Sequence, residues 1–217
     1  MTRKQLIKLI EDGENLTVEF KQRFSSEEKI AKEMIAFANT KGGIIIFGVE
    51  DDGRICGVLS EKGEAELIKT SAEKFCEPAV KYTIEFLNIG NDELVIVSIP
   101  ESINKPHRIQ DFQKRIDLNT AQVYVRVNDK SVLASKEMIK ILQSKANDTS
   151  LINYTISKNE KTAFELLGKF ETITVKQLAE RANLSNRRAS RTLINMVRAN
   201  LLYIHHKENG EEFFSLI

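Results

Sequence analysis

The chain has 217 residues, of which 41% are hydrophobic and 29% are charged; this is the composition of an ordinary folded protein and excludes disorder as the general expectation. The length suits two domains better than one, because domains commonly hold about 100 to 150 residues. The formal net charge is only +1, so a nucleic-acid-binding function would need basic residues gathered on one surface.

The two cysteines, Cys56 and Cys76, lack the CxxC or cysteine–histidine spacing of a structural zinc site. We interpret both as reduced thiols. No segment approaches the ~20 apolar residues of a membrane helix, and the N-terminus has no apolar signal-peptide core. We therefore expect a cytoplasmic protein that has no membrane partner.

The first elements alternate between helix and strand. Apolar spacing predicts a helix over 3–12 that ends at Gly13, and the alternation in "LTVEFK" predicts a half-buried strand over 16–21. Ser26 is a candidate N-cap for a helix that ends near Asn39. The continuously apolar "GGIIIFGV" then predicts a central strand that is covered on both faces.

The next segments predict more strands around one helix. The "DDG" turn into "RICGV" predicts a hairpin. A helix is expected over 61–76 with Leu67, Ile68, Ala72 and Phe75 on its inward face. A second hairpin joins "VKYTIEFL" to "ELVIVSIP". A strong strand, "QVYVRV", follows at 122–127, and a helix at 135–145 closes this part of the chain.

These elements predict an α+β fold for the first domain, residues 1–146, with helices packed on a mixed β-sheet. The polar stretch at 147–157 is expected to be a linker. A second, small domain is expected at 158–217 because the pattern there becomes mostly helical.

The order of elements in 158–217 is helix, helix, turn, helix and hairpin, which is the order of a winged helix. The segments are 160–169, "TVKQLAERANL", "SNRRASRTLINMVRANLL", "LYIHH" and "EEFFSLI". Between the second and third helices we expect Asn183 to adopt the left-handed conformation and Ser185 to be the N-cap of the third helix.

The third helix of this domain is basic on its outer side. Its arginines are Arg187, Arg188, Arg191 and Arg198. No acid interrupts them, and the apolar positions fall on a different face, as a major-groove recognition helix requires. The best candidates for base contact are Asn186 and either Arg187 or Arg191, and the candidates for phosphate contact are Ser185 and Arg188. On an arbitrary helix four arginines would only keep a face solvated, but the surrounding helix order favours DNA.

Residues 155–217 resemble the winged helix-turn-helix domains of bacterial and archaeal transcription regulators, and this resemblance implies a DNA-binding role. Some winged helices bind RNA or protein instead. The wing here, "HHKENGEE", has one lysine against three acids, whereas a wing that grips phosphates would be more basic. Regulators of this type are often dimers, so the resemblance also allows a homodimer.

Gly42 and Gly43 raise the question of a phosphate-binding loop. A P-loop places G-x-x-x-x-G-K-[ST] between a strand and the helix that follows it. These glycines follow a helix and precede a strand, and no GK[ST] occurs in the chain. We interpret them as residues of a tight helix-to-strand turn, which leaves nucleotide binding without a P-loop to support it.

The segments "GENLTVEFKQ", "IAKEMIAFANTKGGIIIFGVEDDGRICGV", "PHRI" and "VYVRVNDKSVLAS" together resemble the Schlafen AlbA-type domain. That resemblance implies a nucleic-acid-binding domain, often followed by a winged helix. The residues that match are Glu14, Glu19, Phe20, Lys21, Phe37, Asn39, Gly42, Gly43, Gly48, Asp51, Asp52, Gly53, Tyr124 and Arg126. Two features depart from the pattern: Glu50 replaces the usual first acid of the turn, and "NDKS" replaces a glycine–serine pair.

Some Schlafen relatives are metal-dependent endoribonucleases that act on structured RNA such as tRNA. The resemblance would place their site at Glu14, Glu19 and Asp51, with Mg²⁺ or Mn²⁺ as the cofactor and Lys21 as a phosphate contact. Carboxylates that converge on such an ion can orient a water molecule and offset charge on the scissile phosphate. Two arguments oppose this: residues 14 and 19 face opposite sides of an extended chain unless the backbone bends near Asn15, and the acids could be solvated turn residues.

A second phosphate-contact surface is predicted around 105–115, where Lys105, Arg108, Lys114 and Arg115 form a basic run; Arg126 is a further candidate contact. We interpret His107, His205 and His206 as structural. The leading hypothesis is a DNA-binding transcriptional regulator, and the alternative is a divalent-metal endonuclease acting on DNA or structured RNA.

Overall fold

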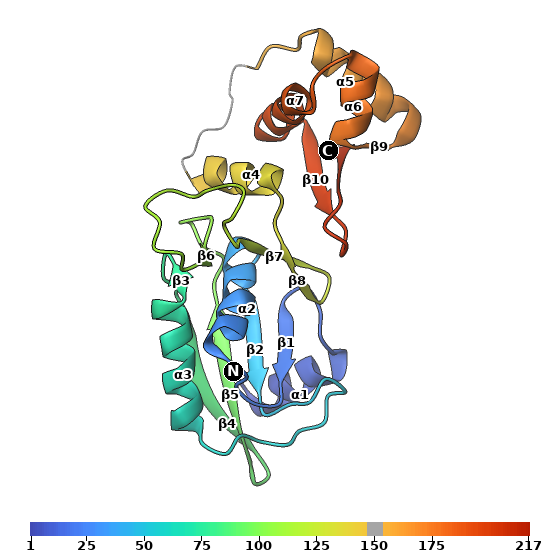
Figure 1. Ribbon diagram of the computed structural model, residues 1–217. Coiled ribbons are helices and arrows are strands. Elements are labelled where there is room, and N and C mark those ends of the chain that lie inside the picture. Colours follow the sequence, from blue (N-terminus) through green and yellow to red (C-terminus); the bar gives the residue numbers. More distant parts are fainter. Residues whose placement is uncertain (147–153) are drawn as a thin grey trace. The chain divides into compact units, whose positions relative to one another are not determined.

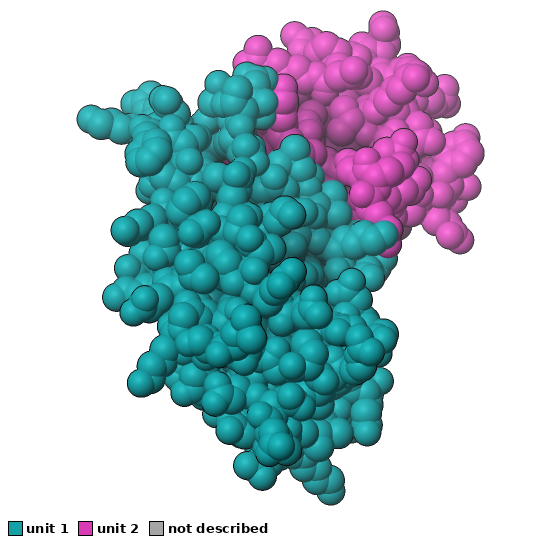
Figure 2. All heavy atoms as spheres, turned by 60° about the horizontal axis from the view of Figure 1, so that its bottom comes forward, with its two compact units in different colours: residues 1–133 teal, residues 134–217 magenta. Residues whose placement is uncertain are grey.

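A computed structural model describes residues 1–146 and 154–217 (Figure 1). These residues form two compact units, Met1–Leu133 and Ala134–Ile217 (Figure 2). The first seven residues of the predicted linker, 147–153, lie outside the described part of the chain. Within the described part, no helix combines the length and the apolar character that crossing a membrane requires.

A mixed sheet forms the centre of the first unit and confirms the α+β prediction. Its strands are β1 (Val18–Lys21), β2 (Gly43–Phe47), β5 (Asp92–Ile99) and β4 (Thr83–Ile89), in that spatial order. β2 runs parallel to β1 and antiparallel to β5. Ile45 and Ile46 in β2 are both fully buried, each in a different apolar cluster, because successive side chains of a strand point to opposite faces.

Helices cover both faces of this sheet. On one face, α2 (Glu27–Asn39) and α3 (Glu61–Lys74) supply buried side chains to the larger cluster, and on the other face α1 (Arg3–Asp12) supplies Leu6 and Ile10. The predicted start of α2 is confirmed, since Ser26 accepts a hydrogen bond from the backbone N–H of Lys29. Gly13, with φ of 76°, ends α1 as predicted.

Several local predictions for this unit were wrong. The expected hairpin after "DDG" is reduced to one bridge between Val49 and Ile55, because the backbone N–H groups of Cys56 and Gly57 both donate to the carbonyl of Gly48 and turn the chain aside. On α3, Ile68 and Ala72 are fully buried as predicted, whereas Leu67, also predicted to face inward, is 39% exposed.

The strand predicted at 122–127 is shorter and does not join the main sheet. It is β7 (Tyr124–Val127), which pairs with an unpredicted strand, β8 (Lys130–Leu133). A further unpredicted pair joins β3 (Cys76–Glu77) to β6 (Arg108–Ile109). β7 packs on α2, and this contact places Arg126 beside the main sheet.

The second unit contains the predicted helix, helix, turn, helix and hairpin. Its helices are α4 (Lys136–Ala146), α5 (Lys158–Phe170), α6 (Val175–Ala182) and α7 (Asn186–Arg198). Its sheet is β10 (Leu202–His206), β11 (Glu212–Leu216) and a short strand that was not predicted, β9 (Thr172–Ile173). Asn183 is left-handed with φ of 52°, and Ser185 caps α7, as predicted.

α4 lies in this second unit and packs on α7. Within that contact, the hydroxyl of Ser190 in α7 donates to the Glu137 carboxylate in α4 at 2.6 Å. Ile139 and Leu142 of α4 are buried, and so is Ile194 of α7. α4 is thus joined to α7 by packing and by this hydrogen bond.

Candidate nucleic-acid interface

The outward face of α7 is polar and basic from its first residue. The candidate contact residues Ser185, Asn186, Arg187, Arg188 and Arg191 are all exposed. The side chains at Ala189, Leu193 and Met196 are fully buried in the core that α5 and α6 share with α7. The 3.6-residue period of the helix therefore separates a packed side from a cationic side.

The N-terminal end of α7 reinforces that cationic side. No acidic residue occupies its first turn, and the Ser185 side chain accepts a hydrogen bond from the Arg188 backbone N–H. The remaining N–H groups of the first turn carry the positive end of the helix dipole. Together with Arg187 and Arg188, this end of the helix can bind phosphate groups.

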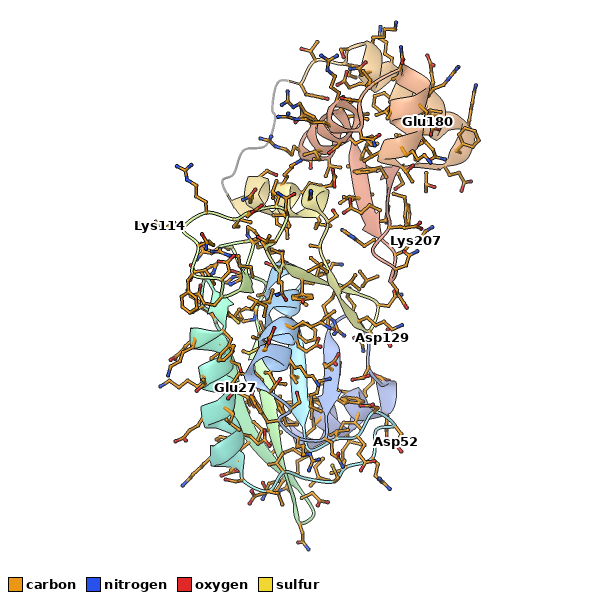
Figure 3. The ribbon with its side chains drawn as sticks, in the orientation of Figure 1. Glu27, Asp52, Lys114, Asp129, Glu180 and Lys207 are labelled. Carbon is orange, nitrogen blue, oxygen red and sulfur yellow. The ribbon has the colours of Figure 1, made fainter. Side chains whose placement is uncertain are left out.

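The wing between β10 and β11 contributes little free positive charge. Lys207, labelled in Figure 3, pairs with Glu211 at 3.2 Å, and both side chains are largely exposed. Hydrogen bonds from Asn209 and Lys207 lower the pKa of Glu211, so this acid stays ionised at neutral pH. The basic surface of the winged helix therefore lies on α7.

The loop at 105–115 contains two cationic side chains that are paired within the protein and two that are exposed. The Lys105 ammonium donates to the Thr40 carbonyl at 3.0 Å and pairs with Glu101. The Arg108 guanidinium donates to the Asp111 carboxylate and to the Gln113 carbonyl at 2.6 Å. The side chains of Lys105 and Arg108 are only 7% and 6% exposed. Both charges are therefore paired inside the protein.

Lys114 and Arg115 complete that basic run and are exposed. In Figure 3 the Lys114 side chain projects away from the ribbon. Of the predicted second surface, these two side chains are the ones that solvent reaches freely.

Arg126 is a buried structural clamp in the described fold. Its side chain is 0% exposed, and its guanidinium donates to Glu19 at 2.7 Å and to Glu33 at 3.3 Å. It also donates to the Asn15 carbonyl at 2.8 Å and lies 4.6 Å from the centre of the Phe37 ring. A cation held by two carboxylates, a carbonyl and a ring face is not presented to a phosphate.

The backbone bends where a shared site for Glu14 and Glu19 would require it. Asn15 bridges to Val18, and its side chain accepts hydrogen bonds from the backbone and hydroxyl of Thr17. Beyond this bend, the Glu14 carboxylate accepts from the backbone N–H of Phe20 at 2.7 Å. The bend thereby brings the two glutamates to the same region, whereas on a fully extended chain they would face opposite sides.

The Glu14 carboxyl group is affected by burial and by the charges of Glu19 and Asp51. Burial raises the pKa of Glu14; the Phe20 hydrogen bond opposes that change, and the charges of Glu19 and Asp51 add to it. Asp51 itself lies in an exposed turn with Asp52. Burial of Glu19, at 7% exposure, departs from the half-buried strand that was predicted, because Arg126 neutralises this acid inside the fold.

These residues do not fit a divalent ion in the described arrangement. One Glu19 oxygen pairs with Lys21 and the other with Arg126, so a metal ion at Glu19 would have to compete with two cations. Among residues 1–146 and 154–217, no group of three or more His, Cys, Asp or Glu side chains is arranged to hold a metal ion. We therefore propose no metal-dependent step through Glu14, Glu19 and Asp51.

Asn39 has a structural role that the sequence analysis missed. Its side-chain amide donates to the carbonyls of His107 and Tyr124, and its oxygen accepts from the His107 backbone N–H, all at 2.8 to 2.9 Å. The side chain is 2% exposed. The sequence contains a signal for this role: Asn39 ends the apolar stripe of a helix, and a polar side chain buried there needs hydrogen-bond partners.

A family model for the Schlafen, AlbA_2 domain matches residues 14–135, which is more than half of the 217 residues. The chain belongs to the Schlafen AlbA_2 family. The match contains the bend at Asn15, the central strand and the Arg126 clamp. The AlbA_2 domain suggests nucleic-acid binding.

Solved structures similar to this AlbA_2 protein include two from bacteria. One is the N-terminal domain of a RecG-related protein from Nitrosomonas europaea, with 19% identity, a TM-score of 0.46, and coverage of 58% of this chain and 89% of that chain. The other is the DIP2311 protein from Corynebacterium diphtheriae, with 20% identity and a TM-score of 0.43. That match covers 59% of this chain and 28% of the other.

Proposed function

We propose that this AlbA_2 protein is a DNA-binding transcriptional regulator whose winged helix contacts the duplex through α7. The observation that carries the proposal is the exposed, acid-free first half of α7, with Arg187, Arg188 and Arg191 on its outer side. Phosphate contacts from arginine and from a helix N-terminus orient a recognition helix, and the neighbouring polar side chains can then contact base edges.

The AlbA_2 domain supports the same partner class. In this domain Lys114 and Arg115 are exposed cations, and we assign any contribution to phosphate binding to them. The cationic groups of Lys105, Arg108 and Arg126 form ion pairs and hydrogen bonds inside the fold, so we assign these residues a structural role. The proposed interface therefore rests first on α7.

Fluorescence anisotropy of the full chain with a labelled duplex, at several salt concentrations, tests this proposal. We expect the double substitution Arg187→Ala and Arg188→Ala to weaken binding and to reduce the slope of log K against log salt by about 2, because each lost phosphate contact removes about one unit. The matched control is Lys161→Ala, an exposed cation of α5. Equal affinity and slope in the double variant and the parent would refute the role of α7.

A second arm compares the duplex with structured RNA, for which tRNA is a suitable probe. We expect tighter binding to the duplex, and loss of duplex binding in the α7 variant. Tighter binding of tRNA that the α7 substitutions leave unchanged would assign the protein to RNA and to another surface.

Incubation of the same RNA and of single-stranded DNA with the protein and Mn²⁺ tests the endonuclease alternative. We expect no cleavage, because both Glu19 oxygens are engaged by cations. Asp51→Asn is the suitable site variant, since Asp51 is exposed. Replacing Glu19 would remove an ion-pair partner of the buried Arg126. Cleavage that EDTA and Asp51→Asn both abolish would replace the regulator proposal with the nuclease.

A further inference from the structure

A cationic hollow of about 600 Å³ lies between α4 and α7, inside the winged-helix unit. Residues from both helices form it: Lys140 and Gln143 from α4, with Arg187, Arg191, Asn195 and Arg198 from α7. No carboxylate is among the described residues that line it. We call this feature the α4–α7 hollow.

The packing of α4 on α7 sets the geometry of the hollow. The part-buried hydrogen bond between Ser190 and Glu137 joins the two helices, and the buried Ile194 is one of the residues that line the hollow. Arg187 and Arg191 are one helical turn apart on α7, which separates their positions by about 6 Å along the axis. Lys140 faces the same space from α4. The three cations are thus presented to one volume by two packed helices.

Three cations of the α4–α7 hollow have no acidic partner among the described residues. Within the described part of the chain, Lys140, Arg187 and Arg191 form no ion pair. Like charges held around one volume repel each other, and an anion that enters it removes that repulsion. Guanidinium groups favour phosphate because they can donate two parallel hydrogen bonds, and the amides of Gln143 and Asn195 add neutral donors.

We propose that the α4–α7 hollow binds a small ligand that carries at least two phosphate groups. Its volume falls within the range of about 300 to 1,000 Å³ that small-molecule sites occupy. Two phosphates match cations presented from two helices, since each helix can neutralise one group.

Arg187 and Arg191 line this hollow and also belong to the proposed DNA surface. If both assignments hold, the phosphorylated ligand and DNA compete for the same two side chains, and the ligand acts as an effector that releases DNA. This regulatory step rests on the proposed function. The binding of the ligand itself does not.

Calorimetric titration of the full chain with sodium pyrophosphate, at low ionic strength, tests the site. We expect saturable binding that is tighter than binding of inorganic phosphate, and a loss of about tenfold or more on Lys140→Gln or Arg191→Gln, as removal of one charged hydrogen bond produces. The matched control is Lys161→Gln on α5, with thermal unfolding checked for every variant. Absence of pyrophosphate binding, or an equal loss in the control, would overturn the proposal.

Two further arms separate this inference from the DNA-binding proposal. Lys140→Gln should lose pyrophosphate binding and retain duplex binding, whereas Arg188→Gln, outside the hollow, should do the reverse. If Lys140→Gln leaves pyrophosphate binding unchanged while Arg188→Gln weakens duplex binding, only the site in the hollow is refuted. A 12-nucleotide single strand tests the other source of phosphates, and Lys140-dependent binding of that strand without pyrophosphate binding would refute a small-molecule site.

Discussion

The Nη1 atom of Arg126 lies 2.7 Å from a carboxylate oxygen of Glu19, although 107 positions separate the two residues in the chain. The same guanidinium donates to the Asn15 carbonyl and covers the Phe37 ring. One buried cation thereby joins β7, β1, the bend before β1 and α2. The arginine and acid that could suggest phosphate and metal chemistry instead stabilise each other inside the fold.

Replacing Arg126 should destabilise the AlbA_2 domain strongly. Arg126→Gln removes the charge that compensates Glu19 and Glu33, and breaking one side of a buried pair costs about 3 to 5 kcal/mol. Urea unfolding measures the change. Arg54→Gln serves as the control, since Arg54 pairs with Glu50 at the surface and its loss should leave the midpoint unchanged. An unchanged midpoint for Arg126→Gln would show that the clamp does not stabilise the domain.

Gly43→Ala should also destabilise the protein, for a steric reason. A Cβ at Gly43 would lie 2.4 Å from the Phe37 ring and 2.7 Å from the Thr17 carbonyl oxygen, and overpacking of this kind costs about 1 to 3 kcal/mol. Gly168→Ala is the matched control: it lies in α5 with open space around it, and should stabilise by about 0.5 to 1 kcal/mol. Thermal unfolding of both variants distinguishes these signs.

Glu14 should make the stability of the protein depend on pH. Its pKa is raised in the folded state by burial, with added repulsion from Glu19 and Asp51, so the folded state binds the proton more tightly than the unfolded state. The protonated side chain therefore contributes stability below the unfolded pKa near 4.5, and that contribution is lost as the pH rises through the folded pKa.

Glu14→Gln isolates this effect, because the amide oxygen can still accept from Phe20. We expect the variant and the parent to differ least in unfolding free energy near pH 4, with the variant gaining relative stability as the pH rises to 7. Urea unfolding at both pH values measures the two differences. A gain of the variant as the pH falls would contradict the raised pKa.

His107 should remain neutral at physiological pH. Burial lowers the pKa of His107, and the charge of nearby Lys105 lowers it further. The hydrogen bond to the Pro78 carbonyl raises this pKa but does not cancel the other two effects. The Pro78 carbonyl can only accept, so Nδ1 carries the hydrogen at 2.7 Å and Nε2 accepts from the Ser102 hydroxyl. Long-range ¹H–¹⁵N spectra should show the Nδ1–H form and a titration midpoint below 6.5. A midpoint above 6.5 would rule out the neutral buried state.

The sequence predicted the elements whose signals are local. The spacing of apolar residues predicted β2 and α7, and the capping side chains predicted where α2 and α7 begin. Both signals depend only on residues close together in the chain. The resemblance to the Schlafen AlbA-type domain added the identity of the first domain, which periodicity alone does not supply.

The sequence could not show which charges are satisfied across the fold. Arg126 lies in a strand between Val125 and Val127, and only the packing of β7 on α2 places it over Phe37 and beside Glu19. The short pairs β3–β6 and β9–β11 were missed for a similar reason. Two-residue strands carry no periodic signal, and their partners are distant in the chain.

The position of α4 also affects how this protein can be divided for study. A cut after residue 146, at the end of α4, would remove α4 from α7 and separate Glu137 from Ser190. A cut between Leu133 and Ala134 follows the boundary of the compact units. Loss of DNA binding after the first cut could reflect damage to α7, whereas the second cut would test the winged helix with its own supporting helix attached.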